Sequence, residues 1–401
     1  MFLDWQFNSY VSKQMQPEFK EELLGLRDGG YSTGNYAIYR YVQRVLVVSS
    51  YPGDISGNIE HALLDEFIRA FTPKLRSKGV YSVLSSNKPH YLDWSSGYMK
   101  EKRIQCSFFA VWGNRTVDGK VFTMRNLDWA ANTGINQNKI VFVYKIDGEI
   151  AHSTLGFPGI IGALMGMSAA GLTVHEAGLD SHKETELGNQ WTLRLRYIMA
   201  KAKNLEEAEY IWRNTNNTLG MNHMVGSGNV YDEKLPAIVM ETMAGYTAFF
   251  RDHDKREDNT TFVDPKTKSK YIAGHSMPHV IFRTNHGYDP TIRKNLVVPM
   301  PEENSDTMKR YFLLRDGFNW YSATRPMSEL DALNMTAIPA DKGNNFKKCP
   351  NNSDGINVIS VMYSPEDLRM WAAFEYSHGK DFRPACCGVY VEMDMKLWFK
   401  A

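Results

Sequence analysis

The chain has 401 residues, of which 43% are apolar and 23% charged, and its formal net charge is +1. This length suffices for a large hydrophobic core, and the balanced charge lacks the basic stripe of a nucleic-acid-binding protein. No apolar run of about eighteen residues occurs, so no membrane-spanning helix is expected. We expect no cofactor. We also expect no metal site, because the four cysteines lack the spacing and paired histidines of a zinc site.

The first 105 residues are predicted to be mostly helical. Apolar residues recur with helical spacing over residues 17–26 and 56–71, and Gly29-Gly30 is predicted to end the first helix. Residues 81–98 are rich in Ser, Asn, Pro and aromatics without a clear period. This pattern is typical of an exposed segment, where a chain can be cut without destroying a core.

From residue 106 onward the pattern changes to short strands. Strands are predicted at residues 107–112, 121–124, 139–146, 151–155, 171–176, 224–231, 237–242, 246–251, 355–363 and 370–376. Helices are predicted at residues 193–202, 205–212, 309–317 and 328–335, and a surface loop at 252–270. Helices flanking many short antiparallel strands predict an α+β fold, in which helices lie outside two stacked sheets.

The first two strands predict a hairpin, because turn residues fill the interval 113–119 between them. The start of one hairpin strand lies near the end of the other, which brings the Cys106 thiol close to Arg125 and Asp128. A cation lowers the pKa of a thiol, and the thiolate is the nucleophile. For Cys106 the alternative is a buried structural thiol. For Arg125 and Asp128 the alternative is an exposed pair of charges in a turn, which contributes little to stability.

These residues also resemble a known family. Cys-Ser-x-x-Ala at 106–110, Asp118-Gly119 and the block 125–129, Arg-Asn-Leu-Asp-Trp, resemble the start of the mature chain in N-terminal-nucleophile (Ntn) amidohydrolases. The nearest group is the acyl-CoA:isopenicillin N acyltransferase-like family, with choloylglycine hydrolases and acid ceramidase-type amidases as relatives. Weaker fragments follow in the family's order at residues 21–25, 166–172, 284–286 and 305–310. The resemblance implies an Ntn αββα sandwich, with residues 1–105 as propeptide segment and residues 106–401 as catalytic segment of one domain.

The resemblance further implies that the precursor cuts itself. The Cys106 thiol would attack the Gln105 carbonyl, and the freed α-amine, with an ordinary pKa of about 7.7 to 8.0, would serve as base for its own thiol. The two cleaved segments would stay associated. Cys106 would then hydrolyse a non-peptide C–N amide bond of a small-molecule substrate through an acyl-enzyme. The alternatives are an acyltransferase, moving an acyl group between CoA or an amide and an amine, and an inactive binding protein on the same fold.

Further site residues have less specific signals. Arg125 would hold the thiolate and Asp128 the new ammonium, while Arg310 is either a substrate or thiolate contact or a solvated helix arginine. Asn229 is the candidate oxyanion donor, because a tetrahedral intermediate needs fixed N–H groups, although a Gly-flanked Asn is also an ordinary turn residue. The remaining candidates are predicted to bind substrate: Asn126, Trp129, His175, Asn285 and His286. Asn126 alternatively turns the chain at the strand end, and Asn285 and His286 alternatively belong to a turn. His175 and Glu176 could form a general-base pair, but an Ntn site already has its base, so both are placed in the pocket wall at most.

Compartment is indicated only weakly. The first residues lack the basic start and apolar middle of a secretory signal, yet five sequons slightly favour a secreted, lysosomal or endomembrane protein over a cytoplasmic one. The sequons are at Asn114, Asn216, Asn259, Asn334 and Asn351. Two adjacent cysteines, Cys386 and Cys387, could with Cys349 supply one C-terminal disulfide, which would leave Cys106 unpaired; four reduced thiols are the equal alternative.

Overall fold

The strands of the chain form two large antiparallel sheets. The computed structural model describes residues 7–32, 43, 105–128, 139–157, 160–185, 187–229, 232, 234–341, 357–375 and 384–400. The six-stranded sheet has the order β12-β1-β2-β13-β14-β15, and the seven-stranded sheet has the order β3-β4-β5-β6-β7-β8-β9. The strands of the six-stranded sheet are β1 (Gln105–Val111), β2 (Phe122–Asp128), β12 (Val280–Arg283), β13 (Asn357–Ser364), β14 (Arg369–Phe374) and β15 (Val391–Asp394). Those of the seven-stranded sheet are β3 (Ile140–Tyr144), β4 (His152–Gly156), β5 (Met165–Ser168), β6 (Leu172–Gly178), β7 (Met221–Ser227), β8 (Ala237–Met243) and β9 (Tyr246–Phe250).

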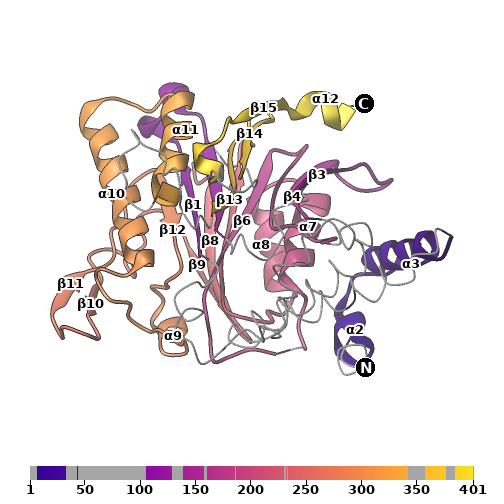
Figure 1. Cartoon of the computed structure of the whole chain (residues 1–401), viewed down its shortest axis with the longest axis horizontal. Helices are drawn as coiled ribbons and strands as arrows, with labels where there is room; N and C mark the ends of the chain where they lie inside the picture. Colours follow the sequence, from indigo (N-terminus) through magenta and orange to yellow (C-terminus); the bar gives the residue numbers. More distant parts are fainter. Residues whose placement is uncertain are drawn as a thin grey trace, which may run out of the picture.

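Helices cover the outer faces of both sheets (Figure 1). On one side α7 (Trp191–Lys201) packs on β4, β5 and β6, and α8 (Leu205–Arg213) packs on β7. On the other side α10 (Asp306–Thr324) packs on β12, and α11 (Glu329–Ala337) packs on β2 and β13. Between the layers β6 packs against β1 and β2, so the main hydrophobic core lies between the sheets. This order of helix, sheet, sheet and helix confirms the predicted α+β sandwich.

The N-terminal segment packs on the outside of α7. It comprises η1 (Phe7–Val11), α2 (Ser12–Gln14) and α3 (Pro17–Ser32). Phe19 and Leu23 are buried with Leu193 of α7, and Arg196 Nη1 lies 2.6 Å from Glu22 Oε2. The predicted stop at Gly29-Gly30 is wrong, because α3 continues through both glycines. A glycine inside a helix is penalised by only about 1 kcal/mol relative to alanine, which neighbouring residues can offset. The predicted helix at 56–71 lies outside the described residues.

Other elements depart from the sequence prediction. Helix α10 extends well beyond residue 317, because Gly317 acts as a close-packing residue: a Cβ there would lie 2.6 Å from Met335 Sδ of α11. The predicted loop at 252–270 contains β10 (Thr261–Val263), which pairs with β11 (Lys270–Ile272). The remaining elements are short, so their apolar period is too brief to read: β12, β15, α9 (Pro290–Arg293), α12 (Met395–Lys400), η3 (Gly113–Arg115), η4 (Val117–Gly119), η8 (Ile338–Asp341) and η10 (Ala385–Cys387).

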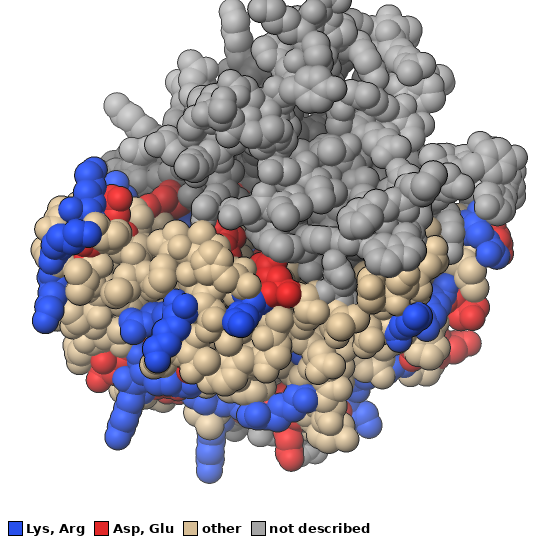
Figure 2. Space-filling view, turned by 90° about the horizontal axis from the view of Figure 1, so that it is seen from below, with Lys and Arg blue, Asp and Glu red and all other residues tan. Residues whose placement is uncertain are grey.

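The described surface shows mixed charge. Seen from below Figure 1, lysine and arginine side chains are spread over several parts of the described surface, with acidic side chains among them (Figure 2). None of the helices built by the described residues is long and apolar enough to cross a bilayer.

Candidate active site

The predicted hairpin forms and places Cys106 at one end of the six-stranded sheet. In the β1–β2 register Cys106 lies opposite Leu127, and Gln105 lies opposite Asp128. A short connection of two 3-10 turns joins the strands, with Asp118 and Gly119 at positive φ values of 62° and 72°. Aspartate and glycine tolerate this left-handed conformation better than most residues. The local sequence therefore fixes the register that brings the thiol to the end of β2.

The Cys106 thiol is buried and free, and it faces a cation. Arg125 Nη2 lies 3.3 Å from Cys106 Sγ, and the Asp128 backbone N–H also donates to the sulfur. Burial raises the pKa of the Cys106 thiol, while Arg125 opposes that rise. The free thiol thus lies beside donors that favour its thiolate form, within an environment that otherwise favours the neutral form.

A carboxylate from the other sheet holds Arg125 in place. Arg125 is completely buried, its Nη2 forms a short ion pair with Glu176 Oε1, and its Nε donates to the Glu176 carbonyl at 3.0 Å. A buried guanidinium needs such a partner, because desolvating an unpaired charge costs several kcal/mol. Sequence reasoning placed Glu176 in the pocket wall at most, and the structure corrects this to direct contact with the thiol's cation. A charged residue predicted to lie within a buried strand was the available signal.

The Cys106 backbone is held by two residues distant in the sequence. Its N–H donates to Asn285 Oδ1 at 2.9 Å, and its carbonyl accepts from Arg310 Nη1 of α10. Arg310 Nη2 donates to the same Asn285 oxygen at 2.8 Å, while Asn285 Nδ2 donates to the Gly178 carbonyl at 2.9 Å. These partners define the amide orientation of Asn285 and fix the atoms on both sides of the Cys106 α-carbon. Two predicted residues, Asn285 and Arg310, therefore meet at Cys106.

Asp128 lies at the same end of the sheet and is 2% exposed. Its carboxylate oxygen Oδ1 accepts from Asn357 Nδ2 of β13 at 2.8 Å, and Asn357 Oδ1 accepts from the Cys386 backbone N–H at 2.7 Å. Asn357 was not predicted, because its role depends on strand pairing between residues far apart in the chain. The carboxylate is thus held at the end of β2, on the residue that pairs with Gln105.

Three other predicted residues lie in different surroundings. Asn126 faces α11 and η8, donating to the Thr336 carbonyl at 2.7 Å and accepting from the Ser360 hydroxyl. His175 lies between the sheets with its ring 5.5 Å from that of Tyr363, and burial holds its pKa well below the usual value. Burial also lowers the pKa of His286 to about 3, and its Nε2 lies 2.7 Å from the Tyr288 hydroxyl. Burial therefore favours the neutral form of both histidines, and their role in substrate binding stays a prediction.

The predicted oxyanion donor, Asn229, is not brought to Cys106. Gly178, the residue whose carbonyl binds Asn285, pairs with Met221 at the start of β7, whereas Asn229 follows the last residue of that strand. Its Nδ2 donates instead to the Lys203 carbonyl at 2.8 Å. The expectation failed because a Gly-flanked asparagine marks a turn, and this turn lies at the opposite end of the sheet. Trp129 lies outside the described residues.

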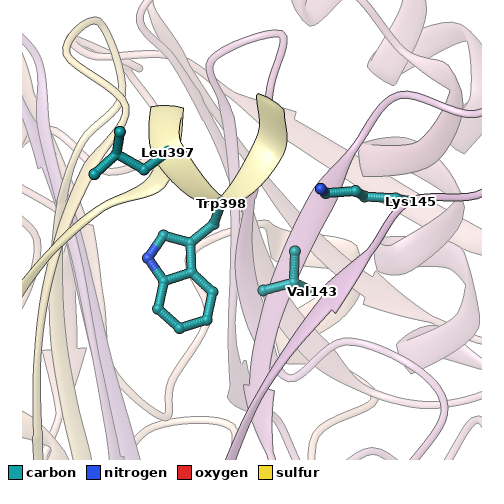
Figure 3. A pocket seen from close by; sticks show the side chains of 4 residues that line it. All are labelled: Val143, Lys145, Leu397 and Trp398. Carbon is teal, nitrogen blue, oxygen red and sulfur yellow. The ribbon is translucent and has the colours of Figure 1, made fainter. Parts of the chain in front are cut away.

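A cavity of about 590 Å³ lies away from this cluster. Val143 and Lys145, at the end of β3, face Leu397 and Trp398 of α12 across it (Figure 3). Ile140, at the other end of β3, pairs with Gly156 on the side of the sheet nearer Cys106. The described lining residues carry no thiol, hydroxyl or carboxylate, and Lys145 supplies their one amine. Among the described residues no group of three or more His, Cys, Asp or Glu side chains is arranged to hold a metal ion.

Comparison with known proteins gives a family match. The profile of the acyl-coenzyme A:6-aminopenicillanic acid acyl-transferase family matches residues 115–376. No curated protein matches the chain significantly.

Similar solved structures have low sequence identity. The Caenorhabditis elegans ortholog of N-acylethanolamine-hydrolyzing acid amidase is 12% identical with a TM-score of 0.44, covering 65% of this chain and 93% of that one. A mutant of conjugated bile acid hydrolase from Clostridium perfringens is 12% identical with a TM-score of 0.42, covering 73% and 93%. Penicillin V acylase from Agrobacterium tumefaciens is 10% identical with a TM-score of 0.41, covering 73% and 86%.

The sandwich and the family match define the class of protein. Two stacked antiparallel sheets between helical layers are the Ntn-hydrolase fold, and the chain is an enzyme of amide hydrolysis or acyl transfer. More specifically, the chain belongs to the acyl-coenzyme A:6-aminopenicillanic acid acyl-transferase family, because that profile matches more than half of its length. The matched residues include Arg125 and Asp128 and begin just after Cys106.

Proposed function

We propose that the protein is a self-processing cysteine amidase that cuts its own chain between Gln105 and Cys106. The observation that carries this proposal is the environment of Cys106: a buried thiol 3.3 Å from Arg125 Nη2, with its backbone N–H on Asn285 Oδ1 at 2.9 Å. Cys106 thus combines a nucleophilic thiol, a neighbouring cation and a backbone held by hydrogen bonds. Such an arrangement suits a residue that serves both as nucleophile and as a new chain terminus.

The self-cleavage step is an acyl shift followed by hydrolysis. The Cys106 sulfur adds to the Gln105 carbonyl carbon, the C–N bond breaks, and the leaving nitrogen takes a proton to become the free α-amine. Water then cleaves the thioester, which yields the Gln105 carboxylate and restores the thiol. The proposed segments 1–105 and 106–401 stay associated, and the packing of α3 on α7 supports this.

Substrate cleavage uses the same atoms. The Cys106 α-amine takes the thiol proton, the sulfur attacks the substrate carbonyl, and the protonated amine returns the proton to the leaving nitrogen before water releases the acyl group. Arg125 stabilises the thiolate, and Asp128 stabilises the ammonium. Asn285 and Arg310 position the terminal residue, because both contact its backbone. We propose a non-peptide amide, an N-acyl amide or small peptide-like molecule, as substrate.

Acyl transfer is the second candidate, favoured by the family match to an acyl-transferase. The two activities share the acyl-enzyme and differ only in whether water or an amine attacks it. Incubation of the purified protein with fluorogenic N-acyl amides of aminomethylcoumarin, with and without an added amine, separates them by product mass. Free acid alone supports hydrolysis, and an acylated amine supports transfer. Turnover by Cys106→Ala at the wild-type rate would contradict both.

We also propose a secreted or lysosomal location, for which the sequons are the support. Asn114, Asn216, Asn259 and Asn334 are all exposed, which an attached glycan requires. Asn351 lies outside the described residues, as does Cys349, so the proposed C-terminal disulfide stays a prediction. A mass decrease after treatment of protein from a eukaryotic host with an N-glycosidase would support the location, and unmodified sequons in that host would contradict it.

A further inference from the structure

A buried carboxylate near the active-site end of the molecule finds no hydrogen-bond donor in the part of the chain that the structure describes. Glu375, which follows β14, is 3% exposed, and neither of its carboxylate oxygens has a hydrogen-bond partner among the described residues. Burying an unpaired carboxylate is unfavourable, and the protein commonly responds by a raised pKa. Burial indeed raises the pKa of Glu375 to about 7. The carboxylate is therefore an acceptor held ready for a donor that the described chain does not supply.

A lysine from the other sheet lies beside it. Lys139, which precedes β3, donates from Nζ to the Glu375 backbone carbonyl at 2.6 Å. Burial lowers the pKa of Lys139, and its charge opposes the rise of the Glu375 pKa. Because the ammonium hydrogen-bonds to the carbonyl, the carboxylate oxygens remain available. The contact joins the last residue after β14 in one sheet to the first residue before β3 in the other.

Strand pairing places this contact at the same end of the sandwich as Cys106. Along the six-stranded sheet, Cys106 pairs with Leu127, Leu127 with Ile359, and Ile359 with Phe374, the residue before Glu375. Three strand spacings of roughly 4.8 Å separate Cys106 from this position by roughly 14 Å.

The second sheet gives the same placement. Ile140, next to Lys139, pairs with Gly156, and the adjacent Leu155 pairs with Met165. The Met165 sulfur in turn lies 3.7 Å from Arg125 Nη1, the guanidinium that contacts the thiol. Lys139 and Glu375 thus both lie at the end of the sandwich where Cys106 is found.

We propose that Glu375 and Lys139 form a distal subsite that binds an ammonium group at the far end of the substrate's acyl chain. This inference rests on the proposed amidase function. The acyl group is the part of the substrate that becomes bonded to the Cys106 sulfur, so its length sets where its far end lies. An acyl chain that reaches Glu375 must span roughly 14 Å. There the substrate ammonium donates a hydrogen bond to the Glu375 carboxylate, and Lys139 holds the Glu375 backbone through its hydrogen bond to the carbonyl.

The test compares two aminomethylcoumarin amides, of ω-aminododecanoic and of dodecanoic acid. A hydrogen bond to a charged group contributes about 1.5 to 3 kcal/mol, which corresponds to about a 10- to 150-fold change in kcat/KM. We expect wild type to prefer the ammonium-terminated amide by at least about tenfold through a lower KM. Glu375→Gln is expected to abolish the preference while kcat and the turnover of the methyl-terminated amide stay unchanged.

The control is Glu392→Gln, a matched change at a half-exposed glutamate of β15 that pairs with Arg369. It is expected to leave both substrates unaffected. Equal turnover of both amides by wild type, or an equal loss of both in Glu375→Gln, would overturn the subsite and leave the amidase proposal intact. If neither amide is hydrolysed, calorimetry with the Cys106→Ala protein decides: selective binding of the ammonium-terminated amide, lost in Cys106→Ala/Glu375→Gln, supports the subsite, and no selectivity overturns it.

Discussion

Replacement of Arg125 by methionine tests whether the guanidinium acts on the thiol or only on the fold. Methionine is of similar length and apolar, so Arg125→Met removes the charge while keeping most of the buried volume. The change removes the donor 3.3 Å from Cys106 Sγ and the ion pair with Glu176 together. Both stability and activity are expected to fall, for different reasons.

The loss of stability and the loss of activity differ in size, and a second substitution is expected to restore only the stability. Leaving the buried Glu176 carboxylate unpaired costs about 3 to 5 kcal/mol of unfolding free energy. Arg125→Met/Glu176→Gln removes that unpaired charge and is expected to recover most of the stability. Losing one hydrogen bond from a charged donor costs about 1.5 to 3 kcal/mol in the reaction, or about a 10- to 150-fold fall in kcat/KM. That loss should persist in the double variant, because the thiolate still lacks its cation.

The assay measures three quantities on each variant: the urea midpoint, kcat/KM, and the rate of iodoacetamide alkylation of Cys106 against pH. Because Arg125 opposes the burial-driven rise in the thiol pKa, the alkylation profile should move to higher pH in both variants. Glu176→Gln alone is the matched control that keeps the cation. Recovery of full activity and of the wild-type alkylation profile in the double variant would refute a direct action of Arg125 on the thiol.

Three further variants probe other contacts. Asn285→Ala should lower kcat/KM about tenfold or more by releasing the Cys106 backbone, whereas Asn229→Ala, remote from that residue, should not; equal effects would contradict the assignment. Glu375→Gln should raise the thermal midpoint at pH 8 but not at pH 4. The folded wild-type carboxyl has a pKa of about 7, whereas the unfolded carboxyl ionises at lower pH. Wild-type stability therefore falls as pH rises from the unfolded pKa to the folded pKa, and the glutamine variant avoids this loss. Asp331→Asn should cost about 1 kcal/mol at pH 7 by weakening the α11 capping box. Because Arg325 lowers the folded pKa of Asp331, the cost should begin to shrink as pH falls below the unfolded aspartate pKa of about 4 and disappear only as pH passes through the lower folded pKa; a pH-independent cost would oppose this.

The parts of the site that follow from local sequence were predictable. Cys106, Arg125 and Asp128 belong to one hairpin, so turn residues and strand length alone bring them together. The layered fold was likewise predictable, because segments with helical spacing flank many short runs with the pattern of antiparallel strands. The family resemblance added the expectation that Arg310 and residue 285 reach the same place.

The remaining contacts depend on tertiary packing, which the spacing of apolar residues within one segment does not predict. Asn285 and Arg310 contact Cys106 across 179 and 204 residues of sequence. Their arrival depends on how β12 pairs with β1 and how α10 packs on β12. Asn229 was chosen because a tetrahedral intermediate needs fixed N–H donors, and its glycine neighbours, which indicate a turn, carry no information about which end of the sheet that turn occupies. Glu176 was undervalued because its partner, Arg125, lies in the other sheet.

The central claim is that Cys106 becomes a chain terminus and the nucleophile at once. Intact-protein mass spectrometry of the purified wild type and of Cys106→Ala tests it most directly. The account predicts two associated fragments for the wild type, one ending at Gln105 and one starting at Cys106, and a single uncut chain for Cys106→Ala. An uncut wild-type chain that hydrolyses amides, or a cut at the same bond in Cys106→Ala, would contradict it.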